Sequence, residues 1–63
     1  MENNVIKLMQ KLEKEFISAA HDSEKFVEGN NSAGTRVRKA MQAVKLMAQG
    51  IRVEVQDQKN TSF

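Results

Sequence analysis

Two amphipathic stretches of the chain are separated by Gly29-Asn30-Asn31-Ser32-Ala33-Gly34-Thr35-Arg36-Val37-Arg38-Lys39-Ala40. Gly29 can adopt the left-handed backbone conformation that ends many helices, because it has no Cβ. Asn30, Asn31 and Ser32 have side-chain oxygens that can accept hydrogen bonds from the free N–H groups of a new first turn. The segment therefore predicts the end of one helix and the start of another.

The same segment carries three cations within four positions, Arg36, Arg38 and Lys39. A helix N-terminus with free amides and neighbouring arginines is suited to bind an anion. A capped turn followed by a solvated basic face also explains these residues, so both interpretations stay open at this point.

Residues 3–28 have the apolar spacing of one amphipathic helix. The steps alternate between four and three residues, as in the seam of a coiled coil. The row consists of Val5, Met9, Leu12, Phe16, Ala19 and Phe26, with Ser23 at one position. Asn3 or Asn4 can cap the start. We predict a helix over about residues 3–28 and a turn at 29–31.

Residues 32–56 repeat the pattern. Their apolar row consists of Ala33, Val37, Ala40, Val44, Met47 and Ile51. The alternation at residues 51–55 is also compatible with a short strand, but the sequence offers no second strand to pair with it. We predict a second helix to about residue 56 and a frayed tail at 57–63.

Together these elements predict an all-α fold, an antiparallel two-helix hairpin that forms a single domain over residues 1–63. A chain of 63 residues without Cys buries too little surface to be comfortably stable alone. Further apolar side chains lie outside the two rows and would remain exposed: Ile6, Leu8, Ile17, Met41, Leu46 and Val53. We therefore expect a homodimer that closes a four-helix bundle.

Charge is distributed unevenly along the chain. Residues 1–29 hold four basic and six acidic side chains, whereas residues 30–63 hold six basic and two acidic ones. No acidic residue occurs from Gly29 to Val53. Arg38, Lys45 and Arg52 are seven residues apart, so they line up on one side of the second helix with steps of about 10 Å. This asymmetry indicates a polyanionic partner.

Residues for other chemistry are sparse. The single His21 lies among charged neighbours on the polar side, and Glu24 and Glu28 have no His or Cys that would complete a metal site. No nucleophile–base pair or phosphate-binding loop motif is present. We expect no enzyme activity, metal, cofactor or small-molecule substrate. No apolar run approaches the roughly 20 residues of a membrane span, and the N-terminus lacks the features of a secretion signal.

The segment from Gly29 to Ala40 resembles the Gly-Asn-x-Ala-Ala/Gly-x-Arg-x-Arg segment of the linker-histone-like proteins of chlamydiae. The resemblance implies a DNA-condensing nucleoid protein with a self-associating helical domain, and it places Arg36, Arg38 and Lys39 at the family's basic motif. Chlamydial members continue into a long Lys/Ala/Pro-rich tail, where this sequence has Asn60-Thr61-Ser62-Phe63.

Charge pattern and resemblance together predict a histone-like architectural protein of the bacterial cytoplasm, acting at the nucleoid in chromosome condensation. It would bind duplex DNA through its phosphates with little sequence preference, since Trp and Tyr are absent. The expected contacts come from Ser32, Thr35, Arg36, Arg38, Lys39, Lys45 and Arg52, together with the backbone amides near Ser32–Gly34. The alternative is a helical oligomerisation or protein-interaction module whose basic side only keeps it in solution.

Overall fold

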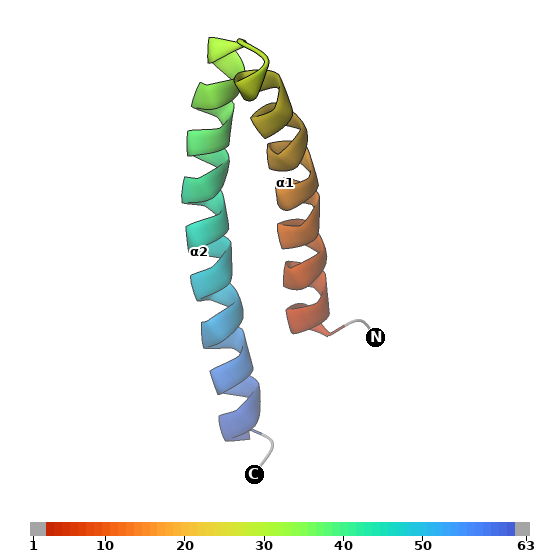
Figure 1. Cartoon of the computed structure of the whole chain (residues 1–63). Coiled ribbons are helices and arrows are strands. Elements are labelled where there is room, and N and C mark those ends of the chain that lie inside the picture. Colours follow the sequence, from red (N-terminus) through yellow and green to blue (C-terminus); the bar gives the residue numbers. More distant parts are fainter. Residues whose placement is uncertain (1–2, 62–63) are drawn as a thin grey trace.

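Two antiparallel helices make up the regular structure of the described part of the chain (Figure 1). The structure is a computed structural model that describes residues 3–61. Helix α1 spans Asn4–Val27 and helix α2 spans Asn31–Thr61. The molecule measures 52 × 20 × 11 Å, which is one layer of helices. The predicted hairpin is confirmed, and the strand considered for residues 51–55 is helical instead.

The turn between the helices is fixed by backbone hydrogen bonds. Gly29 has a φ of 114°, in the left-handed region. Its N–H donates to the carbonyl of Phe26 at 3.0 Å, and the N–H of Asn30 donates to the carbonyl of Lys25 at 3.0 Å. This pair of bonds is the Schellman motif, which ties off the last carbonyls of a helix. Asn30 then caps α2, because its Oδ1 accepts from the N–H of Ala33 at 3.1 Å.

Next to the turn, the ring of Phe26 lies directly on the backbone of Gly34. A Cβ at position 34 would lie 2.6 Å from Phe26 Cδ1 and 2.8 Å from Cε1. Only a residue without a side chain allows this approach. Gly34 therefore lets an aromatic side chain of α1 cover the first turn of α2.

Small side chains dominate the contact between the helices. Ala19, Ala33, Ala40 and Ile51 are the buried apolar residues, and Ala33 has no exposed surface. The remaining positions of the apolar row of α2, namely Val37, Val44 and Met47, are half-buried. On α1, the predicted positions Val5, Leu12 and Ala19 also lie against α2.

Other positions of the predicted row of α1 are largely exposed in the hairpin, although Phe26 lies on Gly34 of α2. Met9, Phe16 and Phe26 are 41%, 50% and 50% exposed, and Ser23 is exposed as well. Half-buried positions on α1 are instead Leu8, Glu15 and Asp22, so Leu8 is not the exposed residue that was expected. The apolar arc of α1 is wider than one row. Helix α1 turns toward α2 the side of this arc from which Asp22 reaches Arg36.

Helix α2 ends later than expected. It continues through residues 57–61, which were expected to fray, while residues 62 and 63 of that predicted tail lie outside the described residues. The physical reason is a tie between the chain ends. Asn3 Nδ2 donates to Gln58 Oε1 at 2.9 Å, and Gln58 Nε2 donates back to Asn3 Oδ1 at 3.0 Å. Because Asn3 Oδ1 also accepts from the N–H of Val5, one side chain caps α1 and holds the last turns of α2.

Replacing Gly34 and Gly50 separately by Ala should have opposite effects. Ala in a helix is favoured over Gly by about 1 kcal/mol, and a Cβ at Gly50 meets nothing within 4 Å, so Gly50→Ala should raise the melting temperature. At Gly34 the new methyl group must displace the Phe26 ring, which costs about 1–3 kcal/mol and outweighs the helix gain. Thermal unfolding followed by circular dichroism tests the pair; an equal rise for both variants would show that the Phe26 contact has no energetic value.

Candidate nucleic-acid interface

A row of exposed cations follows the outer side of α2. It consists of Arg38, Lys45 and Arg52, as predicted, and continues to Lys59 at the next seven-residue step. We call these four residues the basic line. Consecutive members are separated by about 10 Å along the helix, at 1.5 Å per residue. Among residues 3–61 the only ion pair joins Arg36 to Asp22, so no carboxylate of that part of the chain neutralises the basic line.

Arg36 has a structural partner. Its Nε donates to Asp22 Oδ1 at 3.0 Å, and the Asp22 side chain is only 15% exposed. Because the two residues belong to different helices, the pair fixes α1 against α2 near the turn. The side chain of Arg36 remains 49% exposed, but its charge is compensated, so it differs from the basic line.

Lys39 lies between the basic line and α1, because it borders a hollow that contains Arg38 as well as a groove beside α1. It borders a groove between the helices that also contains Glu15, Ser18, Asp22 and Arg36. Two carboxylates thus face the two cations in this groove. The three cations expected to act together are therefore divided: Arg38 lies on the outer side, Arg36 lies beside the acidic residues of α1, and Lys39 borders both places.

Near the start of α2, Ser32 and Thr35 are exposed. Thr35 borders a shallow hollow with Arg38, Lys39 and Gln42, so a hydroxyl, an amide and two cations surround one place on the outer side. The backbone amide of Ala33, one of those expected to meet a phosphate, already donates to Asn30 Oδ1. Side chains rather than that amide are therefore the groups available to an anion here.

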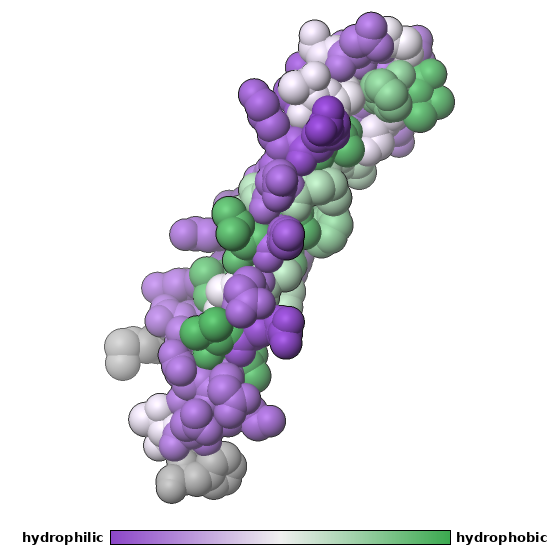
Figure 2. Space-filling model, turned by 90° about the vertical axis from the view of Figure 1, so that its left-hand side faces the viewer, coloured by the Kyte–Doolittle hydropathy of each residue, from purple (hydrophilic) through white to green (hydrophobic). Residues whose placement is uncertain are grey.

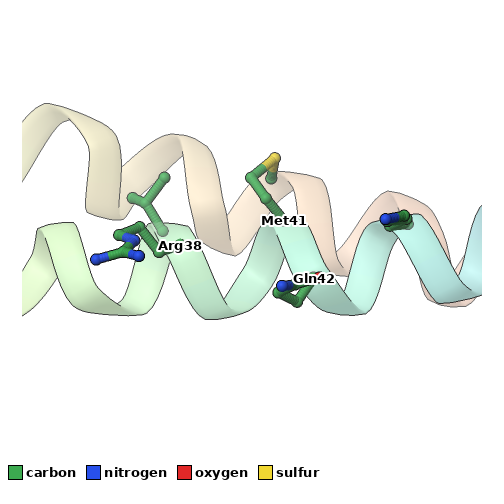
Figure 3. A pocket seen from close by; sticks show the side chains of 5 residues that line it. Arg38, Met41 and Gln42 are labelled. Atoms are coloured by element: carbon green, nitrogen blue, oxygen red, sulfur yellow. The ribbon is translucent and has the colours of Figure 1, made fainter.

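The basic line borders an apolar surface. Val37, Arg38, Met41, Gln42 and Lys45 line one groove, in which Met41 extends toward α1 and Gln42 points away from it (Figure 3). Figure 2, viewed from the α2 side, shows hydrophilic side chains along the whole molecule with hydrophobic groups between and beside them. Sequence reasoning missed Gln42 and Lys59 at this site. The seven-residue step from Arg52 signals Lys59, but the expected fraying concealed it.

Two other kinds of site were sought in the described residues. Within residues 3–61, no three His, Cys, Asp or Glu side chains are grouped closely enough to hold a metal ion. Neither described helix is long and apolar enough to cross a membrane.

In a comparison with known protein families, the chain matches the model described as "Histone H1-like protein Hc1" over residues 6–61. The match includes nearly all of both helices, the turn and the basic line. It confirms the resemblance seen in the segment from Gly29 to Ala40. No curated protein and no solved structure matched the chain. A histone H1-like family is a family of structural DNA-binding proteins and not of enzymes. The chain therefore belongs to the family of the histone H1-like protein Hc1.

Proposed function

We propose that the protein is a small architectural DNA-binding protein of the bacterial nucleoid, which contacts duplex phosphates with little sequence preference. The observation that carries this proposal is the basic line, four exposed cations at regular spacing with no compensating carboxylate among the described residues. Cations that approach phosphates release condensed counterions, and this release drives binding that does not depend on sequence. Membership of a histone H1-like family supports the same partner.

The residues available for DNA contact fall into two groups. The basic line, Thr35 and Gln42 are exposed on the outer side of α2, where a duplex can approach without meeting acidic side chains of α1. Arg36 is paired with Asp22, so it contributes less, whereas Lys39 borders both the outer hollow and the groove with Glu15 and Asp22. Ser32 is exposed at the first turn and extends the outer group toward the end of the molecule. Trp and Tyr, which stack on bases, are absent from the sequence.

We further propose that the acting form is a homodimer, a four-helix bundle. Residues 3–61 contain no large side chain that is fully buried. The hairpin is one layer deep, so each broad side remains in water. A second copy would give the small chain a core and would place two basic lines on one rigid body.

The competing function is that of a helical protein-interaction module. Its supporting observation is the set of large apolar side chains on the outer sides of both helices, of which Ile17 is 62% and Leu46 is 73% exposed. In that case the basic line only solubilises the surface, and DNA affinity at physiological salt would be small.

Salt dependence of DNA binding tests the proposal. If about four phosphates are neutralised, the affinity for a duplex should fall roughly ten- to a thousandfold between about 50 and 200 mM salt. Fluorescence anisotropy with several duplexes of scrambled sequence measures both the slope and the sequence preference. A flat response to salt, or strong preference for one duplex, would contradict phosphate-driven binding.

A charge-matched pair of triple variants separates the basic line from net charge. Changing Arg38, Lys45 and Arg52 to Gln should weaken binding by about an order of magnitude or more and reduce the salt slope by about two to three. Changing Lys7, Lys14 and Lys25 of α1 to Gln removes the same charge from another surface and should change binding far less. Helicity should survive in both, because Gln is a good helix former. Equal losses for the two variants would mean that only net charge matters.

A further inference from the structure

The edge of α2 that lies farthest from α1 is a row of uncharged polar side chains. Each member lies two positions from an inner residue in both directions, as Gln42 does between the buried Ala40 and the half-buried Val44. Two positions correspond to about 200° around a helix, so these side chains are directed away from α1, and Figure 3 shows Gln42 in this orientation. All of them are exposed. We call them the outer row: Thr35, Gln42, Gln49 and Gln56.

The corresponding edge of α1 has a different composition. It carries Gln10, Ile17 and Glu24, which are also seven residues apart. Ile17 lies between the half-buried Glu15 and the buried Ala19, and it is 62% exposed. An edge that faces water thus accommodates an apolar and an acidic residue in this hairpin, whereas the outer row contains neither. The outer row is therefore the edge that suits an anionic partner.

Cations lie on both sides of the outer row near its start. Around the helix, Arg38 is about 40° from Gln42 in one direction and Lys39 is about 60° from it in the other. These three residues and Thr35 line one hollow, and Gln42 shares a second groove with Arg38 and Lys45. An anion attracted by the basic line therefore comes within reach of the Gln42 amide.

Two amides of the outer row are available to a partner. Within residues 3–61, the side-chain amides of Gln42 and Gln49 make no hydrogen bond, whereas Gln56 Nε2 donates to Asn60 Oδ1 at 3.2 Å. A Gln amide has two N–H donors, and Gln side chains are among those that donate to the phosphate oxygens of DNA. Gln42 and Gln49 can thus form hydrogen bonds with the backbone of a duplex.

Contact through the outer row keeps the acidic side chains of α1 away from DNA. An α-helix with its side chains is about 10–12 Å in diameter, so α2 separates the duplex from α1 by about that distance. Exposed charges more than about 8–10 Å apart are largely screened at physiological salt. A hairpin lying on a broad side would instead bring α1 to the duplex, and residues 1–29 hold six acidic side chains. Electrostatics therefore favours contact by the edge.

We propose that the protein meets duplex DNA edge-on, with the outer row toward the duplex and the amides of Gln42 and Gln49 donating to phosphate oxygens beside those that the basic line neutralises. This orientation rests on the proposed function and adds a second kind of contact to it. A neutral donor releases no counterion, so its contribution to affinity does not fall with salt. Both broad sides of the hairpin stay clear of the DNA.

Lysines introduced on the outer row test the orientation. A Lys that faces the duplex neutralises one more phosphate, so Gln42→Lys combined with Gln49→Lys should steepen the salt slope by about two, as measured by fluorescence anisotropy over a series of salt concentrations. The matched control is Gln10→Lys combined with Ile17→Lys, which adds the same charge at the same spacing to the outer edge of α1. Its slope should remain that of the parent, because α1 lies behind α2.

Two results would overturn edge-on contact. Equal slopes for the parent and for the lysine variant of α2 would show that the outer row faces water. An equal steepening by the α1 and α2 variants would show that added charge acts irrespective of its place.

Removal of the amides tests the hydrogen bonds. Gln42→Ala combined with Gln49→Ala should lower the affinity roughly 5- to 100-fold, by the same factor at every salt concentration, since two hydrogen bonds are lost and no charge changes. Ala is the best helix former, so the spacing of the basic line is preserved. Gln10→Ala, which removes an exposed amide from α1, should leave the affinity unchanged. Parental affinity of the double variant would overturn the contribution of the amides.

Failure of the proposed function has a different signature. If the parent binds no duplex even at about 50 mM salt, the proposed function and the contact through the outer row are both wrong. If the parent binds with a steep salt slope but neither the lysine nor the alanine variants of the outer row differ from it, DNA binding stands and edge-on contact is wrong.

Discussion

A pair of helices can bury only one row of side chains on each member, and this limit governs the whole molecule. At 11 Å the hairpin has no second layer. Its seam is therefore built for close approach, with Ala19, Ala33 and Ala40 as buried residues. Small side chains bury little apolar area each. The stability of the fold therefore depends on additional contacts at the two ends of the hairpin.

Those additional contacts explain which features of the fold could be predicted from local sequence patterns and which could not. The turn was predictable, because Gly29 and Asn30 act through bonds to residues within five positions. The apolar row of α2 was predictable as well, since few other rows are available on that helix. On α1 the apolar arc is broad enough for two rows, and local spacing cannot choose between them. The choice depends on the pairing of Asp22 with Arg36, 14 residues away, and the late end of α2 depends on Gln58 and Asn3, which are 55 positions apart.

At the candidate site, too, some features could be predicted from the sequence and others could not. Exposure of Arg38, Lys45 and Arg52 follows from their seven-residue spacing and could be derived without coordinates. Adjacent cations in a helix point in different directions, at about 100° per residue. A cluster that looks continuous in the sequence, such as Arg36, Arg38 and Lys39, is therefore distributed over different surfaces. Which member loses its charge to a carboxylate is decided by α1, and a motif confined to α2 contains no information about that helix.

The length of the basic line is close to the length of one turn of a DNA double helix. Three seven-residue steps separate Arg38 from Lys59, which corresponds to about 31 Å along α2. One turn of B-form DNA advances about 34–36 Å. If the proposed function holds, a helix laid along the duplex would present its first and last cation to phosphates almost one turn of the double helix apart. Under that proposal, the basic line of one copy would span about one helical repeat of the DNA.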